Sequence, residues 1–155
     1  MKRVVLSLVL FASVIAVSAQ PRAIGLRASY GGEVSYQHGF GERNMLQIDV
    51  GVPFFHGIHA VGTYDWIFPI SSWQHAGSWN WYAGVGAGVG LYGFKSASLF
   101  VGVAGMIGVE YNFKFPLQLS LDYRPVIGPW FHDGAMGFNL LGSLHGYGFG
   151  IRYKF

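Results

Sequence analysis

The sequence has no cysteine among its 155 residues. A chain without thiols forms no disulfide, offers no thiolate to a metal and performs no cysteine chemistry. Charge is also scarce, because Asp, Glu, Lys and Arg make up 11% of the residues, against about 25% in soluble domains. The sequence is therefore too poor in charge for the surface of an ordinary soluble domain.

A transmembrane helix is missing as well. Residues 1–19 begin with Lys2 and Arg3, continue with a mostly apolar run and end with small residues. This order is typical of a secretory signal peptide, and it predicts cleavage after Ala19 and a domain over residues 20–155. Beyond residue 19 no uninterrupted run of about 20 apolar residues follows, which excludes a spanning helix.

The predicted mature domain is nearly neutral. Of ten basic residues, Lys2 and Arg3 belong to the signal segment, so eight bases face seven acids. The basic pI therefore gives little support for a nucleic-acid partner, and we expect none.

The last residues, 147–155, alternate strictly between two kinds of side chain. The large apolar ones are Tyr147, Phe149, Ile151, Tyr153 and Phe155, and the small or charged ones are Gly148, Gly150, Arg152 and Lys154. This period-two pattern predicts a strand with two unlike faces.

The same alternation recurs along the rest of the domain. It predicts strands over residues 24–38, 45–54, 58–70, 79–92, 99–112 and 117–124. Prolines and glycines interrupt the pattern after residue 124, and we place a seventh strand at about 135–141, because single-chain bacterial barrels have an even number of strands. This choice makes 126–134 a turn. The alternative is one long outer loop here, with another strand hidden upstream.

The first predicted strand also allows a second interpretation. A two-residue hairpin at Gly31 and Gly32 would place Glu33 opposite Tyr30 and turn the following polar residues toward the apolar face. The unbroken alternation therefore favours one long strand.

The charged residues in the predicted strands all fall in one row. They are Arg27, Glu33, Asp49, Asp65, Glu110, Asp122, Arg124, Arg152 and Lys154. A charge at the bilayer centre costs about 2 to 4 kcal/mol in a transmembrane barrel, so the segregation predicts an apolar row facing lipid. Aromatic residues near the predicted strand ends fit two interfacial girdles. The alternative is a soluble ligand-binding barrel, in which the two faces are reversed.

These features predict an all-β protein, a closed antiparallel up-and-down transmembrane β-barrel of eight strands. A closed barrel satisfies its own backbone in lipid, and an eight-stranded interior is filled by side chains. Because the inward acids and bases nearly balance, we expect a paired polar network in the lumen and no open pore. The predicted members of this network are Arg27, Glu33, Asp49, Glu110, Asp122, Arg124 and Arg152.

Signals for catalysis, metals or cofactors are weak. Gly88, Gly90 and Gly93 have the spacing of a dinucleotide fingerprint, but no helix pattern follows them. The six histidines show no fixed third metal ligand, and His56 and His59 are expected at the surface or the membrane interface. We therefore expect no cofactor, no metal site and no catalytic residue.

The closing strand with its terminal Phe155 resembles the last strand of outer-membrane β-barrels of Gram-negative bacteria. The mature chain resembles the small eight-stranded barrels of the outer-membrane protein A and X type, and residues 110–113 and 119–125 are similar to barrels of Bacteroidetes-type bacteria. This resemblance implies a location in the cell outer membrane, surrounded by its lipid. It also implies that the barrel-assembly machinery is a partner during biogenesis and reads Tyr153 and Phe155.

The resemblance implies no agreed activity, so we expect a structural or surface-interaction role. One alternative is a lipid A-modifying enzyme, of deacylase or acyltransferase type. Some outer-membrane barrels are lipid A deacylases that use Ser, His and an acid, and Ser143 and His145 are the candidates here. In that family, however, the His precedes the Ser by two residues, and here the order is reversed.

Overall fold

The computed structural model is built almost entirely of β-strands. It describes residues 20–53, 57–73, 76–93, 97–141 and 146–155, so the predicted signal segment 1–19 lies outside the described residues. The elements are β1 (Gln20–Ala28), β2 (Gly31–Gly39), β3 (Asn44–Pro53), β4 (Gly57–Pro69), the short 3-10 helix η1 (Ser71–Trp73), β5 (Gly77–Tyr92), β6 (Ser98–Phe113), β7 (Leu117–Tyr123), β8 (Val126–His132), β9 (Ala135–Leu141) and β10 (Tyr147–Lys154). Within the described ranges, no helix has the length and apolar character needed to cross a membrane.

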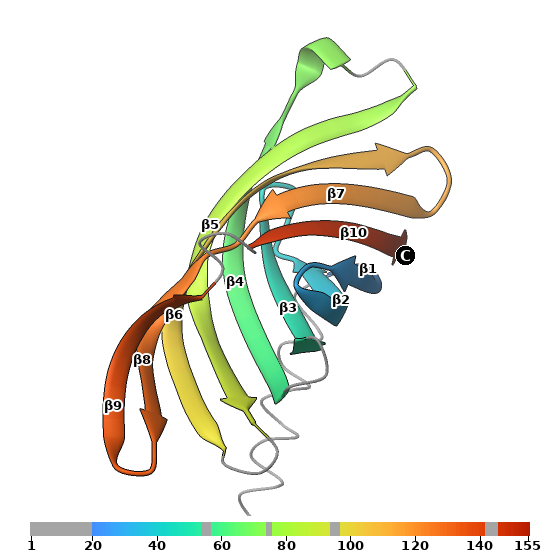
Figure 1. Cartoon of the computed structure of the whole chain (residues 1–155). Helices are drawn as coiled ribbons and strands as arrows, with labels where there is room; N and C mark the ends of the chain where they lie inside the picture. Colours follow the sequence, from blue (N-terminus) through green and yellow to red (C-terminus); the bar gives the residue numbers. More distant parts are fainter. Residues whose placement is uncertain (1–19, 54–56, 74–75, 94–96, 142–145) are drawn as a thin grey trace, which may run out of the picture.

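The strands form a closed antiparallel barrel of eight strands with up-and-down topology (Figure 1). Strands β1 to β7 pair in chain order, and the pairings of β7 with β10 and of β10 with β1 complete the ring. Ala23 lies opposite Lys154, and Ala28 lies opposite Phe149. The predicted fold, an all-β closed up-and-down barrel of eight strands, is confirmed.

The last two barrel strands are each divided into two segments. β7 pairs with one half of β6 and β8 with the other half, while β10 pairs with β7 and β9 with β8. β7 and β8 thus follow one another beside β6, and β9 and β10 return next to them. Figure 1 shows the β8–β9 hairpin extending away from β1 and β2. We call the end that holds Gln20 and Lys154 the terminal end, and the end with the β1–β2 and β8–β9 turns the mouth.

The prediction of one strand over 24–38 is wrong. The chain turns at Ser29 and Tyr30, so that Ala28 pairs with Gly32 and β1 and β2 are separate strands. Three residues lie between these partners, and each residue therefore keeps the face that it would have in one continuous strand. Unbroken alternation argues only against a two-residue turn, and it cannot exclude this one.

The predicted turn over 126–134 is also wrong, because Val126–His132 forms β8. The predicted strand over 135–141 matches β9. The pairing of β6 with β8 skips Gly128 and Pro129, and proline has no N–H to donate to the ladder. The period-two pattern does not predict β8 because it is interrupted at these residues. The barrel still has eight strands, because the predicted first strand is two strands, β1 and β2, whereas β9 and β10 together form one barrel strand.

Burial follows the predicted alternation in the other strands. In β3, Gln47 and Asp49 are buried, while Ile48 and Val50 are exposed. The most exposed aliphatic residues lie in the outward row and include Leu26 and Val103, which are 66% and 67% exposed. The interior is therefore polar and the outer surface apolar.

Outward aromatic rings gather at the terminal end of the barrel. Ring contacts join Tyr36, His38, Phe40, Tyr64 and Trp66, then Phe68 and Trp81, then Trp73, Trp79, Tyr111, Phe113 and Phe115, and finally Tyr153 and Phe155. In the described part of the mouth, the exposed aromatic residues of the β8–β9 hairpin are Phe131 and Phe138. An aromatic belt therefore encircles the terminal end, whereas the outer side of the mouth, as far as the structure describes it, is mainly aliphatic.

The tight packing of β4 against β5 is testable at two glycines. A Cβ added at Gly86 would lie 1.9 Å from the carbonyl oxygen of Gly62, whereas a Cβ at Gly62 would meet only the carbonyl oxygen of Gln47, at 4.0 Å. We expect Gly86→Ala to lower the free energy of unfolding by about 1 to 3 kcal/mol through overpacking. Urea titration of the refolded barrel, followed by tryptophan fluorescence, measures this, with Gly62→Ala as the matched control. Equal loss in both variants would contradict the register of β4 and β5.

Candidate functional site: the barrel interior

A cluster of buried charges fills the barrel between its first and last strands. Its members, at most 4% exposed, are Arg27, Glu33, Asp49, Asp122 and Arg124. They come from β1, β2, β3, β7 and the residue that follows β7. We call these five residues the lumen cluster.

Glu33 is the centre of the lumen cluster. Arg27 Nη1 donates a hydrogen bond to Glu33 Oε2 at 2.8 Å, and Arg124 Nη2 donates to Oε1 at 2.7 Å. Ser29 Oγ donates to Oε1 at 3.1 Å, and His59 Nε2 lies 2.9 Å from the same oxygen. One carboxylate thus holds groups from β1, β2, β4 and the segment after β7 together.

Each arginine also reaches a second acid. Arg27 pairs with Asp122, and Arg124 pairs with Asp49. Two guanidinium groups therefore bridge three carboxylates, in the order Asp122, Arg27, Glu33, Arg124, Asp49. Buried charges are costly unless they are paired and hydrogen-bonded, and this bridging provides both.

Glu110 lies in a second group near the terminal end. It pairs with Arg22 and accepts hydrogen bonds from Asn80 at 2.8 Å, Asn112 at 3.0 Å and Gln118 at 3.0 Å. The sequence analysis did not name Arg22, because the predicted alternation begins at residue 24. β1 begins earlier, at Gln20, and its pairing with β2 shifts register between Pro21 and Ala23. A bulge of this kind hides the face of Arg22 from a period-two pattern.

Arg152 lies inside the barrel but forms no ion pair within the described ranges. Its Nε donates to Ser35 Oγ at 2.8 Å, and its Nη1 donates to Ser120 Oγ at 2.7 Å and to Gln118 Oε1 at 3.4 Å. Lys154 donates to the carbonyl oxygen of Phe113 at 2.8 Å. Gln118 contacts both Glu110 and Arg152. Gln37 and Gln47 form a hydrogen-bonded path from Arg22 to Asp49 of the lumen cluster. The predicted network residues thus belong to one connected network of ion pairs and hydrogen bonds.

His59 is 3% exposed, so the expectation of a surface or interfacial position is wrong. Its odd position in β4 places it on the inward row with Thr63 and Asp65. The odd residue number that His59 shares with these two residues is the sequence feature that indicates its burial. His56, the other histidine considered as a metal ligand, lies outside the described residues.

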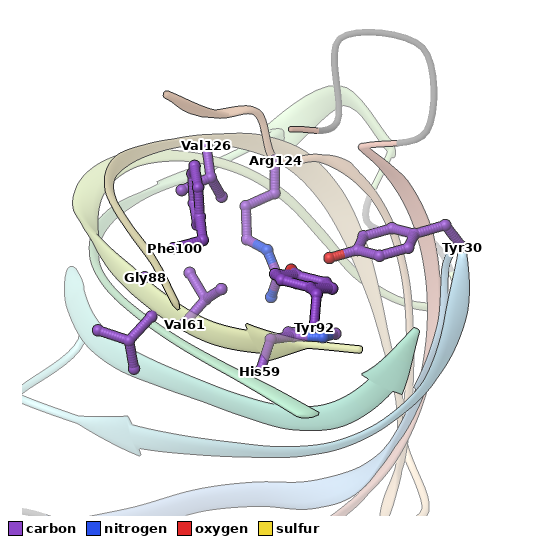
Figure 2. Close-up of a pocket in the computed structure, with 9 residues that line it drawn as sticks. Tyr30, His59, Val61, Gly88, Tyr92, Phe100, Arg124 and Val126 are labelled. Atoms are coloured by element: carbon purple, nitrogen blue, oxygen red, sulfur yellow. The ribbon is translucent and has the colours of Figure 1, made fainter. Parts of the chain in front are cut away.

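Part of the interior near the mouth is apolar. Val61, Phe100, Ala104 and Val126 form a buried cluster, and Tyr92 and Trp130 pack against it. Figure 2 shows Phe100, Val126 and Val61 on one side of a small cavity, opposite Tyr30, Tyr92 and His59, with Arg124 between them. The cavity has a volume of about 10 Å³, which is room for about one water molecule.

A serine, a histidine and an aspartate meet at the rim of the mouth. Ser98 Oγ lies 2.8 Å from His132 Nδ1, and His132 Nε2 lies 3.4 Å from Asp133 Oδ2. The period-two pattern does not predict this trio, because alternation gives the face of a residue but not its partner strand. Ser143 and His145, the pair considered from the sequence, lie outside the described residues.

Tyr153 and Phe155, the predicted assembly signal, lie on the outside of the barrel at the terminal end. They are 56% and 58% exposed, and their rings are in contact. Both are therefore accessible to a partner that approaches from the outer surface.

The part of the chain that the structure describes contains no group of three or more His, Cys, Asp or Glu side chains that could hold a metal ion. No protein-family model, curated protein or solved structure matches the chain. Function is therefore inferred from the geometry and chemistry of the chain itself.

Glu33 offers a direct test of the lumen cluster. Glu33→Gln removes the charge that Arg27 and Arg124 share, and we expect the free energy of unfolding to fall by about 3 to 5 kcal/mol, because a buried pair is broken. Urea unfolding of the refolded barrel measures the loss. Glu42→Gln, in the exposed loop between β2 and β3, is the matched control. A Glu33→Gln barrel as stable as this control would show that the cluster contributes little.

Proposed function

We propose that the protein is an integral outer-membrane β-barrel with a lumen filled by side chains and no open pore. The observation that carries this proposal is the inside-out distribution of its residues. Charged side chains such as Arg27 and Asp49 are buried in the interior, while large apolar ones such as Leu26 and Val103 cover the outside. This distribution of polar and apolar side chains is energetically favourable in a lipid bilayer.

The outer row of β5 shows how well the surface suits a bilayer. Between Trp81 and Leu91 it contains only apolar residues, which are Trp81, Ala83, Val85, Ala87, Val89 and Leu91. β5 and β6 have 16 residues each, more than the roughly 9–11 that a tilted strand needs to cross the hydrocarbon core. In water, apolar rows on neighbouring strands would form an exposed patch far larger than soluble monomers carry.

The closed ring supports the same proposal. A sheet in lipid must satisfy its backbone internally, and the pairing of β10 with β1 leaves neither of these two strands with an open edge. The belt of aromatic rings at the terminal end suits a membrane interface, where amphipathic rings prefer to lie.

The alternative of a soluble ligand-binding barrel is disfavoured by the interior. Such a barrel needs an apolar cavity, but here the centre holds five paired charges, and the cavity at the mouth has room for about one water. The Glu33 carboxylate is also fully engaged by two arginines, Ser29 and His59, so the lumen cluster itself is structural.

Export and assembly complete the proposal. The basic and apolar segment over residues 1–19 would direct export, and the barrel-assembly machinery would bind the strand that ends in Tyr153 and Phe155. The exposure of both rings at the end of β10 supports this role. The resemblance to small outer-membrane barrels of Gram-negative, Bacteroidetes-type bacteria supports the same location and a structural or surface-interaction role.

Fractionation of a Gram-negative host that expresses the full chain tests the location. We expect the protein in the outer membrane, extractable only with detergent, and with a gel mobility that changes on heating. Phe155→Ala should lower its yield in the outer membrane by weakening assembly, whereas Phe115→Ala, an equally exposed phenylalanine at the same end, should not. Recovery as a soluble periplasmic protein would overturn the proposal.

Planar-bilayer recording tests the filled lumen. Because the lumen cluster joins β1, β2, β3 and β7 across the interior, we expect no large, steady conductance from the refolded protein. A bilayer that receives the same detergent without protein is the control. Steady open-channel currents would show that the interior is a water-filled path.

A further inference from the structure

We propose that the mouth carries a serine-hydrolase site for acyl esters of membrane amphiphiles. Ser98 is the nucleophile, His132 is the general base and Asp133 orients the histidine. The site goes beyond the structural role of the barrel, and its lipid substrate class rests on the proposed membrane location.

The geometry of the trio is that of an activated serine. A nucleophile and its base need to lie within hydrogen-bond reach, about 2.6 to 3.2 Å, with the base oriented by a third group. Ser98 Oγ and His132 Nδ1 are 2.8 Å apart, and the exposed Asp133 carboxylate lies 3.4 Å from the other ring nitrogen, Nε2. The two imidazole nitrogens thus have different partners.

The sheet itself places these residues together. Ser98 begins β6 and His132 ends β8, and the neighbouring pair Leu99 and Phe131 fixes the register between the two strands. Asp133 has a positive φ of 42° and precedes Gly134 in the turn to β9. An Asp-Gly pair favours such a turn, so the backbone holds the carboxylate next to the histidine.

An apolar wall lies directly below the trio. On the same inward rows, Phe100 follows Ser98 and Trp130 precedes His132, and these two rings belong to the apolar cluster of the mouth. Phe100 is buried, whereas Trp130 is half-buried. An apolar tail that packs on the Trp130 ring would bring its ester group to the rim.

The barrel wall is interrupted beside this site. β10 pairs with β1 as far as Phe149 and Ala28, and the chain then turns at Ser29 and Tyr30. Among the described residues, β9 continues toward the rim with β8 as its one strand neighbour, as Figure 1 shows. Among the described residues, no strand pairing therefore joins β9 to the β1–β2 turn. The proposed substrate would approach the trio from this side.

The proposed reaction needs no reagent other than water. Ser98 Oγ attacks the ester carbonyl while its proton passes to His132 Nδ1. The bond between the acyl carbon and the alcohol oxygen breaks, and the departing alcohol takes that proton, which leaves acyl-Ser98. Water then attacks the acyl carbon and gives a proton to Nδ1. The bond to Ser98 breaks, Oγ recovers the proton, and the fatty acid is released.

His59, the other histidine in the described part of the mouth, does not offer this chemistry. His59 Nε2 lies 2.9 Å from Glu33 Oε1, and the hydroxyl of the nearby Ser29 donates a hydrogen bond to the same oxygen. Glu33 is in turn held by Arg27 and Arg124. Among the described residues, His59 therefore has no serine partner, and it contacts Glu33 of the lumen cluster.

A fluorophosphonate probe, which reacts with activated serines, tests the site in the full chain refolded in detergent. We expect mass spectrometry to find the label on Ser98, with no label in Ser98→Ala and normal labelling in Ser78→Ala, a serine at the terminal end. His132→Ala should lower the labelling rate by about 100-fold, the scale of general-base catalysis. Folding of each variant is checked by heat-modifiable gel mobility. A folded barrel whose Ser98 is not labelled overturns the proposal.

Hydrolysis of p-nitrophenyl esters in mixed micelles tests the substrate class. We expect faster hydrolysis of long-chain esters than of the acetate, and loss of activity in Ser98→Ala. Equal rates for long and short chains would overturn the acyl-chain assignment. Labelling in detergent does not depend on cellular location. A protein that is labelled at Ser98 but fractionates as soluble would therefore contradict the proposed membrane function, while it would still support Ser98 as the nucleophile.

Discussion

The pairing of β10 with β1 is the constraint on which the rest of the structure depends. It turns an open sheet into a ring, so that each residue has a defined inside or outside. Without this pairing, the charged inward residues would be exposed to water or lipid, and nothing would keep the apolar residues on the opposite face. Closure thus decides which side chains are buried, before any contact between those side chains is considered.

The lumen cluster reinforces this closure from inside. Arg27 on β1 reaches Asp122 on β7, and Arg124 beyond β7 reaches Asp49 on β3 and Glu33 on β2. The ion pairs therefore cross the interior between strands that are far apart in sequence. Each partner would be costly to bury alone, so the arrangement of charges favours the one register in which all five meet.

Much of the fold follows from the period-two pattern. The five predicted strands between residues 45 and 124 match β3 to β7 with ends that differ by at most two residues, and charge segregation identifies their inward rows. The pattern does not show which strands lie next to one another. Glu110 with Arg22, and Ser98 with His132, become partners through strand pairing. The pattern also fails where the backbone is irregular, as at the bulge near Arg22 and at Pro129 in β8.

The turn at Ser29 and Tyr30 leaves the face of every residue unchanged, yet it reverses the direction of the chain. With it, Ala23 lies beside Lys154, so the first and last strands have their outer ends at the same end of the barrel. As one straight strand, residues 24–38 would carry the start of the chain to the opposite end of the barrel. A three-residue separation that is silent in the pattern of apolar and polar side chains thus determines at which end of the barrel the first strand begins.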